Sequence, residues 1–101
     1  MEHFSLLVFE LAGLETVASD YGVVVAEQFH QLLVAAVRRR VDGDGMVAEL
    51  PAVPQVMVVS PLDERAATRL ADQVIGELDL ATSGHDAGGK FAITYRLQHR
   101  N

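Results

Sequence analysis

The sequence has 101 residues, of which 50% are hydrophobic, and its formal net charge at pH 7 is −6. A chain of this length and composition is expected to fold as one compact domain over residues 1–101. Because the net charge is negative, the basic surface that nucleic-acid binding requires is missing, and we expect no nucleic-acid partner.

The chain contains no cysteine, which excludes disulfides and thiolate metal sites. Its apolar runs are too short to span a bilayer, and its first residues lack the basic and apolar segments of a signal peptide. We therefore expect a cytoplasmic protein without membrane insertion. The histidines show no metal-ligand spacing, and we expect neither a metal nor a cofactor; they are His3, His30, His85 and His99.

The first half of the chain predicts a strand followed by helix. "FSLLVFEL" (Phe4–Leu11) is almost continuously apolar, which predicts a central strand buried on both faces. The segment Leu14–Arg40 is helical in pattern, and Gly22 is expected to join a short helix to a long one. Arg38-Arg39-Arg40 would complement the carbonyl end of that long helix. Its apolar stripe has three- and four-residue spacing and comprises Val25, Phe29, Leu32, Leu33, Ala36 and Val37.

Two short apolar segments, 46–50 and 55–60, follow and are predicted to pair as an antiparallel hairpin. Only Pro51–Pro54 separates them. Because proline cannot donate to a ladder, both prolines are expected at or beyond the ends of the pairing. The predicted hairpin tip is therefore rigid and cannot extend the sheet.

The second half predicts one more helix and one more strand. Ser60 is the expected N-cap, Pro61 the first helical residue, and Asp63 completes a pattern similar to a capping box. "KFAITYRL" (90–97) alternates as a strand does. The order βαββαβ predicts an α+β, ferredoxin-like fold: a four-stranded antiparallel sheet with helices on one face.

Two segments of this sequence resemble a known family in pattern and spacing. The hairpin region reads "VAELPAVPQVMVVSP", and the end of the first strand runs into "ELAGLETVASDYGVVVAE". They are similar to the "VARLGGDEF" and "DxDxFKxxNDxxGHxxGD" segments of GGDEF domains, the diguanylate cyclases. The resemblance covers residues 4–97. Its flanks match, but the signature is replaced by Pro51-Ala52-Val53-Pro54-Gln55.

The resemblance implies that most ligand-binding residues of the family are missing. In the family, carboxylates hold the cations that neutralise the triphosphate. Glu10 stands at one of these positions, whereas Val53 and Pro54 stand at the hairpin. The family reads guanine with an Asn and an Asp, which correspond to Ala18 and Glu27. The resemblance therefore implies a catalytically inactive domain in which Glu10 and Glu27 mark the remnant of a nucleotide cleft.

The family's inhibitory cyclic di-GMP site also differs. That site uses Arg-x-x-Asp before the second strand, and the corresponding residues here are Asp42 and Gly45. Arginine binds phosphate with its planar fork, whereas Asp42 would repel it. The family's lead-in segment and closing helix have no counterpart in this sequence, so the resemblance implies a stripped core.

We therefore expect a non-catalytic GGDEF-like regulatory module of bacterial signalling that acts through protein contact, with a partner or as a homodimer. The hairpin tip, Pro51, Ala52, Val53 and Pro54, is the expected docking element, because a pre-ordered apolar tip loses little entropy on binding. One alternative is a receptor for cyclic di-GMP or GTP in a remodelled pocket. Another is an unrelated ferredoxin-like small-ligand sensor or structural subunit.

Overall fold

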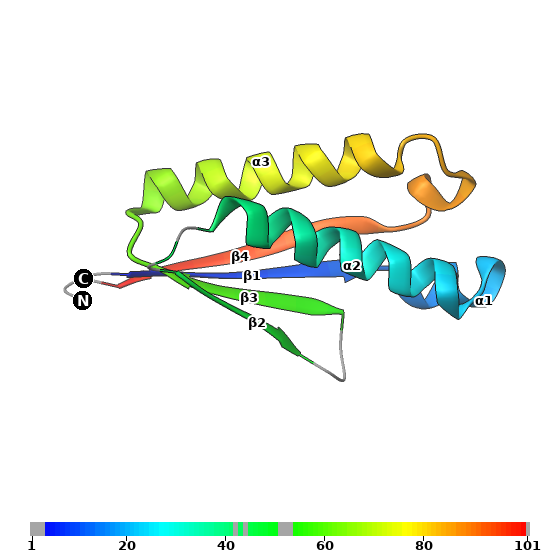
Figure 1. Ribbon diagram of the computed structural model, residues 1–101, viewed down its shortest axis with the longest axis horizontal. Coiled ribbons are helices and arrows are strands. Elements are labelled where there is room, and N and C mark those ends of the chain that lie inside the picture. Colours follow the sequence, from blue (N-terminus) through cyan, green and yellow to red (C-terminus); the bar gives the residue numbers. More distant parts are fainter. Residues whose placement is uncertain (1–3, 42, 44, 51–53, 101) are drawn as a thin grey trace.

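The computed structural model describes residues 4–41, 43, 45–50 and 54–100. Its elements in chain order are β1 (Phe4–Ala12), α1 (Leu14–Tyr21), α2 (Val23–Arg40), β2 (Met46–Leu50), β3 (Gln55–Ser60), α3 (Glu64–Thr82), a 3₁₀ helix (Asp86–Gly89) and β4 (Ala92–Arg100). The strands form one antiparallel sheet in the order β2-β3-β1-β4. Helices α2 and α3 lie together over one face of this sheet (Figure 1). The predicted α+β, ferredoxin-like topology is confirmed.

Strand β1 is central, as predicted, but only one of its faces is covered by helices. Leu7, Phe9 and Leu11 are at most 1% exposed beneath the helices. Leu6, Val8 and Glu10 point the opposite way; Leu6 and Glu10 are half-buried, and Val8 is 9% exposed. On this second face, over which the described part of the chain places no helix, the predicted burial therefore holds for Val8 but not for Leu6. Helices α2 and α3 both lie on the other side of the sheet.

The core forms where the stripes of α2 and α3 meet the sheet. The buried residues of α2 include Phe29, Leu33 and Val37 from the predicted stripe, while Val25 and Leu32 are partly buried against them. In α3 the buried residues include Leu70, Val74 and Leu78. A fully buried side chain of this size contributes about 1.5–3 kcal/mol to folding, so these two stripes fix the helices on the sheet.

Helix α3 begins three residues later than predicted. Ser60 is the last residue of β3 and pairs with Ser5 of β1, so it belongs to the sheet and the helix does not begin directly after it. The N-cap is Asp63, whose side chain accepts a hydrogen bond from the backbone N–H of Ala66 at 2.7 Å. The Ser5 hydroxyl donates to the carbonyl oxygen of Leu62 at 2.8 Å, which fixes the chain just before that cap.

The last strand is shifted toward the end of the chain relative to the predicted range 90–97, since it begins at Ala92. Strand β4 runs to Arg100, and Ile93, Tyr95 and Leu97 contact the core. In the loop, the His85 ring lies 5.2 Å from that of Phe29, edge to face, which anchors the loop on α2. Among the described residues, no helix is both long and apolar enough to cross a membrane.

Gly22 separates α1 from α2, as predicted, and its backbone explains why. Its φ of 99° and ψ of 155° lie in a region that is essentially restricted to glycine. The two helices can therefore change direction without an intervening loop.

We expect Gly22→Ala to destabilise the fold by about 1–3 kcal/mol through backbone strain alone, because a Cβ at this position would meet no atom within 4 Å. Gly76→Ala is the matched control, since Gly76 lies inside α3 with equally open surroundings. It should stabilise the protein by about 0.5–1 kcal/mol. Thermal unfolding measures both changes, and equal effects of the two substitutions would contradict the role of Gly22.

Candidate functional site

The candidate site lies at the end of the molecule where β1 ends, α2 begins and the β2–β3 hairpin turns (Figure 1). Glu10 is near the end of β1, paired in register with Gln55 on one side and Thr94 on the other. Because Phe9 and Leu11 point into the core, the Glu10 side chain projects from the opposite face of the sheet.

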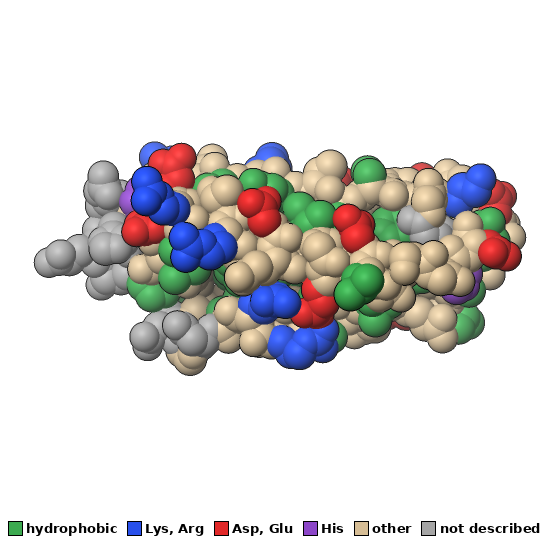
Figure 2. All heavy atoms as spheres, turned by 90° about the horizontal axis from the view of Figure 1, so that it is seen from above, with side chains coloured by type: hydrophobic (Ala, Val, Ile, Leu, Met, Phe, Trp, Pro, Cys, Tyr) green, Lys and Arg blue, Asp and Glu red, His purple; other side chains and the backbone are tan. Residues whose placement is uncertain are grey.

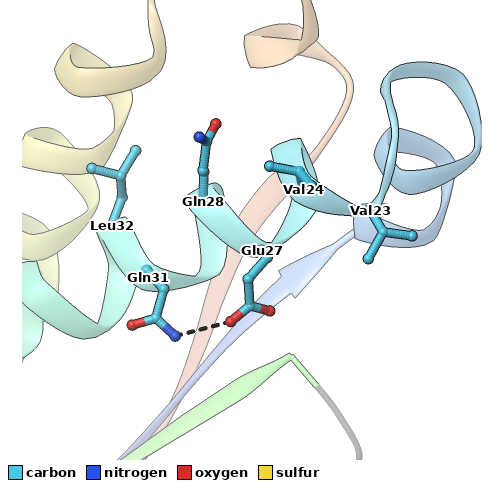
Figure 3. Close-up of a pocket in the computed structure, with 6 residues that line it drawn as sticks. All are labelled: Val23, Val24, Glu27, Gln28, Gln31 and Leu32. Atoms are coloured by element: carbon cyan, nitrogen blue, oxygen red, sulfur yellow. Dashed lines mark hydrogen bonds between the residues drawn. The ribbon is translucent and has the colours of Figure 1, made fainter.

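Glu27 comes from a different layer of the fold. It is exposed on α2 and accepts a hydrogen bond from Gln31 Nε2 at 3.1 Å (Figure 3). It lines an open groove of about 680 Å³ on the surface of this helix. The lining residues that the structure describes belong to α2, and they are Val23, Val24, Glu27, Gln28, Gln31 and Leu32.

The structure therefore does not bring the two predicted carboxylates into one cluster. Glu10 projects from the uncovered face of the sheet, and Glu27 from a helix over the other face. Within the ranges that the structure describes, no three His, Asp or Glu side chains are grouped so that they could hold a metal ion. The groove beside Glu27 is instead largely apolar, because Val23 is 74% exposed and Val24 is 71% exposed.

The hairpin tip is described only at its last residue. Pro51, Ala52 and Val53, like Asp42, lie outside the described residues. Pro54 is half-buried, and its carbonyl oxygen accepts a hydrogen bond from the Leu11 N–H at 3.1 Å, next to the β1–β3 ladder. This proline thus lies at the end of the pairing, as predicted.

A polar contact that the sequence did not predict ties the hairpin to α2. Glu49 of β2 accepts from His30 Nε2 at 3.3 Å, and its other carboxylate oxygen lies 3.9 Å from Arg38 Nη2. The His30 side chain is only 13% exposed, so this contact is largely shielded from solvent on the α2 side. Glu49 stands where the similar family segment "VARL" has arginine. This change from a basic to an acidic residue is the sequence signal for a new partner such as His30 or Arg38.

The arginines lie away from the groove. Arg39 and Arg40 reach across to Glu77 of α3, in addition to their predicted place in the last turn of α2. Figure 2 shows that most basic side chains on the helical side lie between the end that carries the termini and the middle of the molecule, and that one lies at the opposite end. Residues 14–37, which include the groove, contain three acidic residues, Glu15, Asp20 and Glu27, and no Lys or Arg.

Solved structures of other proteins share this topology. The chain is similar to the GGDEF domain of DgcB from Caulobacter crescentus, solved in complex with c-di-GMP, with a TM-score of 0.83 and 10% identity over 98% of this chain and 60% of that one. The chain has the fold of a GGDEF domain. A different strand topology would have supported the alternative of an unrelated ferredoxin-like sensor, and no such topology is observed.

Two more structures with the GGDEF fold agree with this assignment. The GGDEF domain of YfiN from Pseudomonas aeruginosa matches with a TM-score of 0.78 and 14% identity over 97% of this chain and 62% of that one. The active GGEEF domain of a Vibrio cholerae diguanylate cyclase matches with a TM-score of 0.78 and 9% identity over 99% of this chain and 64% of that one. The chain thus spans less than two thirds of each of these three structures. Neither a family model nor a curated protein matches the sequence significantly.

The Glu49 contact predicts how the hairpin responds to charge. Glu49→Arg should destabilise the protein by about 1 kcal/mol, because the new cation faces His30 and Arg38. Glu49→Gln keeps an acceptor for His30 and should cost less than about 0.5 kcal/mol. Thermal unfolding gives the stability, and amide exchange in β2 and β3 reports local opening. If the arginine variant were as stable as wild type, Glu49 would not hold the hairpin.

Proposed function

We propose that this chain is a catalytically inactive GGDEF-like module that regulates a signalling partner through protein contact. The observation that carries the proposal is the groove at the start of α2, where the sequence resemblance places the reading of guanine. In this chain that surface is open, and its described residues belong to α2 and include the exposed Val23 and Val24. Since the similar domains named above come from bacteria, we place the module in a bacterial cytoplasm.

The shape of the groove favours a protein over a small molecule. Pockets for small ligands are concave and cover most of the ligand surface. The described lining of this groove comes from α2, and one helix supplies only one wall for a nucleotide. Two adjacent valines that are more than 70% exposed are instead typical of a contact that another protein covers.

The charges of the groove also disfavour nucleotides. A triphosphate or a cyclic dinucleotide is anionic, and proteins usually hold phosphates with Arg, Lys or bound cations. The groove presents Glu27, and residues 14–37 supply no basic side chain. Anionic ligands would therefore meet repulsion without a compensating cation.

The loss of the GGDEF signature supports the proposal that the chain is catalytically inactive. Two-metal phosphoryl transfer needs several carboxylate ligands around the cations. By sequence, Glu10 is retained at the end of β1, whereas Val53 and Pro54 offer no side-chain ligand. By sequence, the apolar tip Pro51 to Pro54 is proposed as a second docking element, since proline fixes φ and lowers the entropy lost on binding.

A nucleotide receptor is the second candidate, and one observation favours it. The Glu27 carboxylate is hydrogen-bonded to the Gln31 amide on the groove, and such groups can pair with the edge of guanine. The receptor hypothesis predicts that a nucleotide stabilises the folded chain, whereas the protein-contact hypothesis predicts no such effect.

We expect no cyclic di-GMP to form when the chain is incubated with GTP and Mg²⁺ or Mn²⁺. We also expect no change in thermal unfolding with GTP-Mg²⁺ or cyclic di-GMP at a concentration of about one hundred times a micromolar dissociation constant. A ligand of the folded state would add about 2.7 kcal/mol under these conditions. Product formation would refute inactivity. A shift that Glu27→Ala removes, and that Glu64→Ala in the first turn of α3 retains, would establish the receptor instead.

The contact surface itself makes a further prediction. In cross-linking from cell extract, partners captured by wild type should be lost with Val24→Ser and retained with Leu80→Ser. Leu80 is the matched control because it is an exposed apolar residue, 79% accessible, on α3 outside the groove. Retention of the same partners by Val24→Ser would remove the groove from the proposed function.

A further inference from the structure

The face of the sheet opposite the helices has an apolar centre. Strand alternation places Leu6 and Val8 of β1 on this face. Their register partners on β3 are Val59 and Met57. These two adjacent cross-strand pairs lie on the two inner strands of the sheet, and the described helices α2 and α3 cover the other side (Figure 1).

This composition is unusual for a sheet surface that faces water. An antiparallel sheet with one solvated face normally carries polar residues there. Here the apolar centre extends to the outer strand β2, where Met46 pairs with Val59 and is 72% exposed. A contiguous apolar surface on the inner strands favours burial against another surface.

Two charged residues of this face lie at its opposite ends. At one end Arg100 of β4 pairs in register with Phe4 of β1. At the other end stands Glu10, six residues further along β1. A third charged residue, Arg96, lies on the edge strand β4 next to Val8, and Gln98 is next to Leu6. The two inner strands are therefore apolar at their centre and acidic at one end, while β4 adds Arg100 at the opposite end and Arg96 beside the centre.

We propose that a second copy of this chain covers this face in a symmetric dimer. The two-fold axis would run across the strands at the level of Leu7. Such an axis turns the second sheet end over end, so Val8 of one copy meets Leu6 of the other, and Met57 meets Val59. Sheets packed face to face lie about 10 Å apart, a distance that interdigitating side chains fill.

The charges select this axis over the alternative. Turned end over end, the Glu10 carboxylate of each copy comes over the end that carries Arg100 of the other, on the adjacent strand, and Arg96 comes over Gln98. An axis parallel to the strands would instead place Glu10 over the end that carries Glu10 of the other copy. In a two-fold dimer the same surface of both copies must be complementary to itself. Only the axis across the strands brings opposite charges together in this way. The dimer does not depend on whether the chain has lost nucleotide chemistry.

Sedimentation equilibrium of the chain tests the proposal. Wild type should sediment at twice the mass of one chain. Met57→Lys should weaken the dimer by at least about a hundredfold, because it removes apolar contact and buries an unpaired cation in both copies. Leu80→Lys is the matched control, since Leu80 is exposed on α3, and it should leave the dimer unchanged. Circular dichroism verifies that each variant is folded.

Charge exchange tests the axis. Arg100→Glu and Glu10→Arg should each weaken self-association by about fivefold, because each puts like charges together at both symmetric contacts. Mixing the two variants should restore association, since each Glu then meets an Arg.

Three outcomes would overturn the proposal. The first is a wild-type chain that stays monomeric at millimolar concentration, which would assign the face to a different protein. The second is a dimer that Met57→Lys does not weaken, which would assign association to another surface. The third is a mixture of the charge variants that associates no better than either alone, which would exclude this axis.

Discussion

The position of β1 between two partners is the constraint on which the rest of the structure depends. It pairs with β3 on one side and with β4 on the other, so its backbone is held along its whole length. Its helix-facing side chains, Leu7, Phe9 and Leu11, then form the floor of the core, and α2 and α3 pack on that floor. The same alternation places Leu6, Val8 and Glu10 on the opposite face. One strand therefore determines both the core and the surface of the uncovered side.

The two ends of the molecule differ in charge because the strands and helices all run along its long axis. The arginines are in the last turn of α2, the first half of α3 and the second half of β4, near the termini. Glu10 and Glu27 belong to the other end, where the hairpin turns. The negative charge at this end repels anionic ligands such as nucleotides. It does not oppose an apolar contact with Val23 and Val24. The surface chemistry thus agrees with the proposal of protein contact.

Much of the fold could be predicted from periodicity, and the failures have local causes. The stripes of α2 and α3, the break at Gly22 and both hairpin strands depend on residue type and spacing, which the sequence contains. The start of α3 was misplaced because Ser60 suits a cap, but its pairing with Ser5 keeps it in the sheet. The contact of His30 with Glu49 joins residues 19 apart in sequence, and no local pattern reports such a contact. Glu10 and Glu27 were predicted from a family resemblance, which gives positions along the chain and not the layers from which side chains project.

The pairing of β1 with β4 has a consequence for how the chain is made. Phe4 is opposite Arg100, so β1, which is synthesised before the other strands of this sheet, needs β4, which is synthesised after them. During synthesis β1 can pair with β3 while its other edge is unpaired, and an unpaired apolar edge invites contact with other chains. Contacts this distant in sequence also slow folding, because a long loop must close first. The sheet is therefore most exposed to aggregation in the interval before β4 is synthesised.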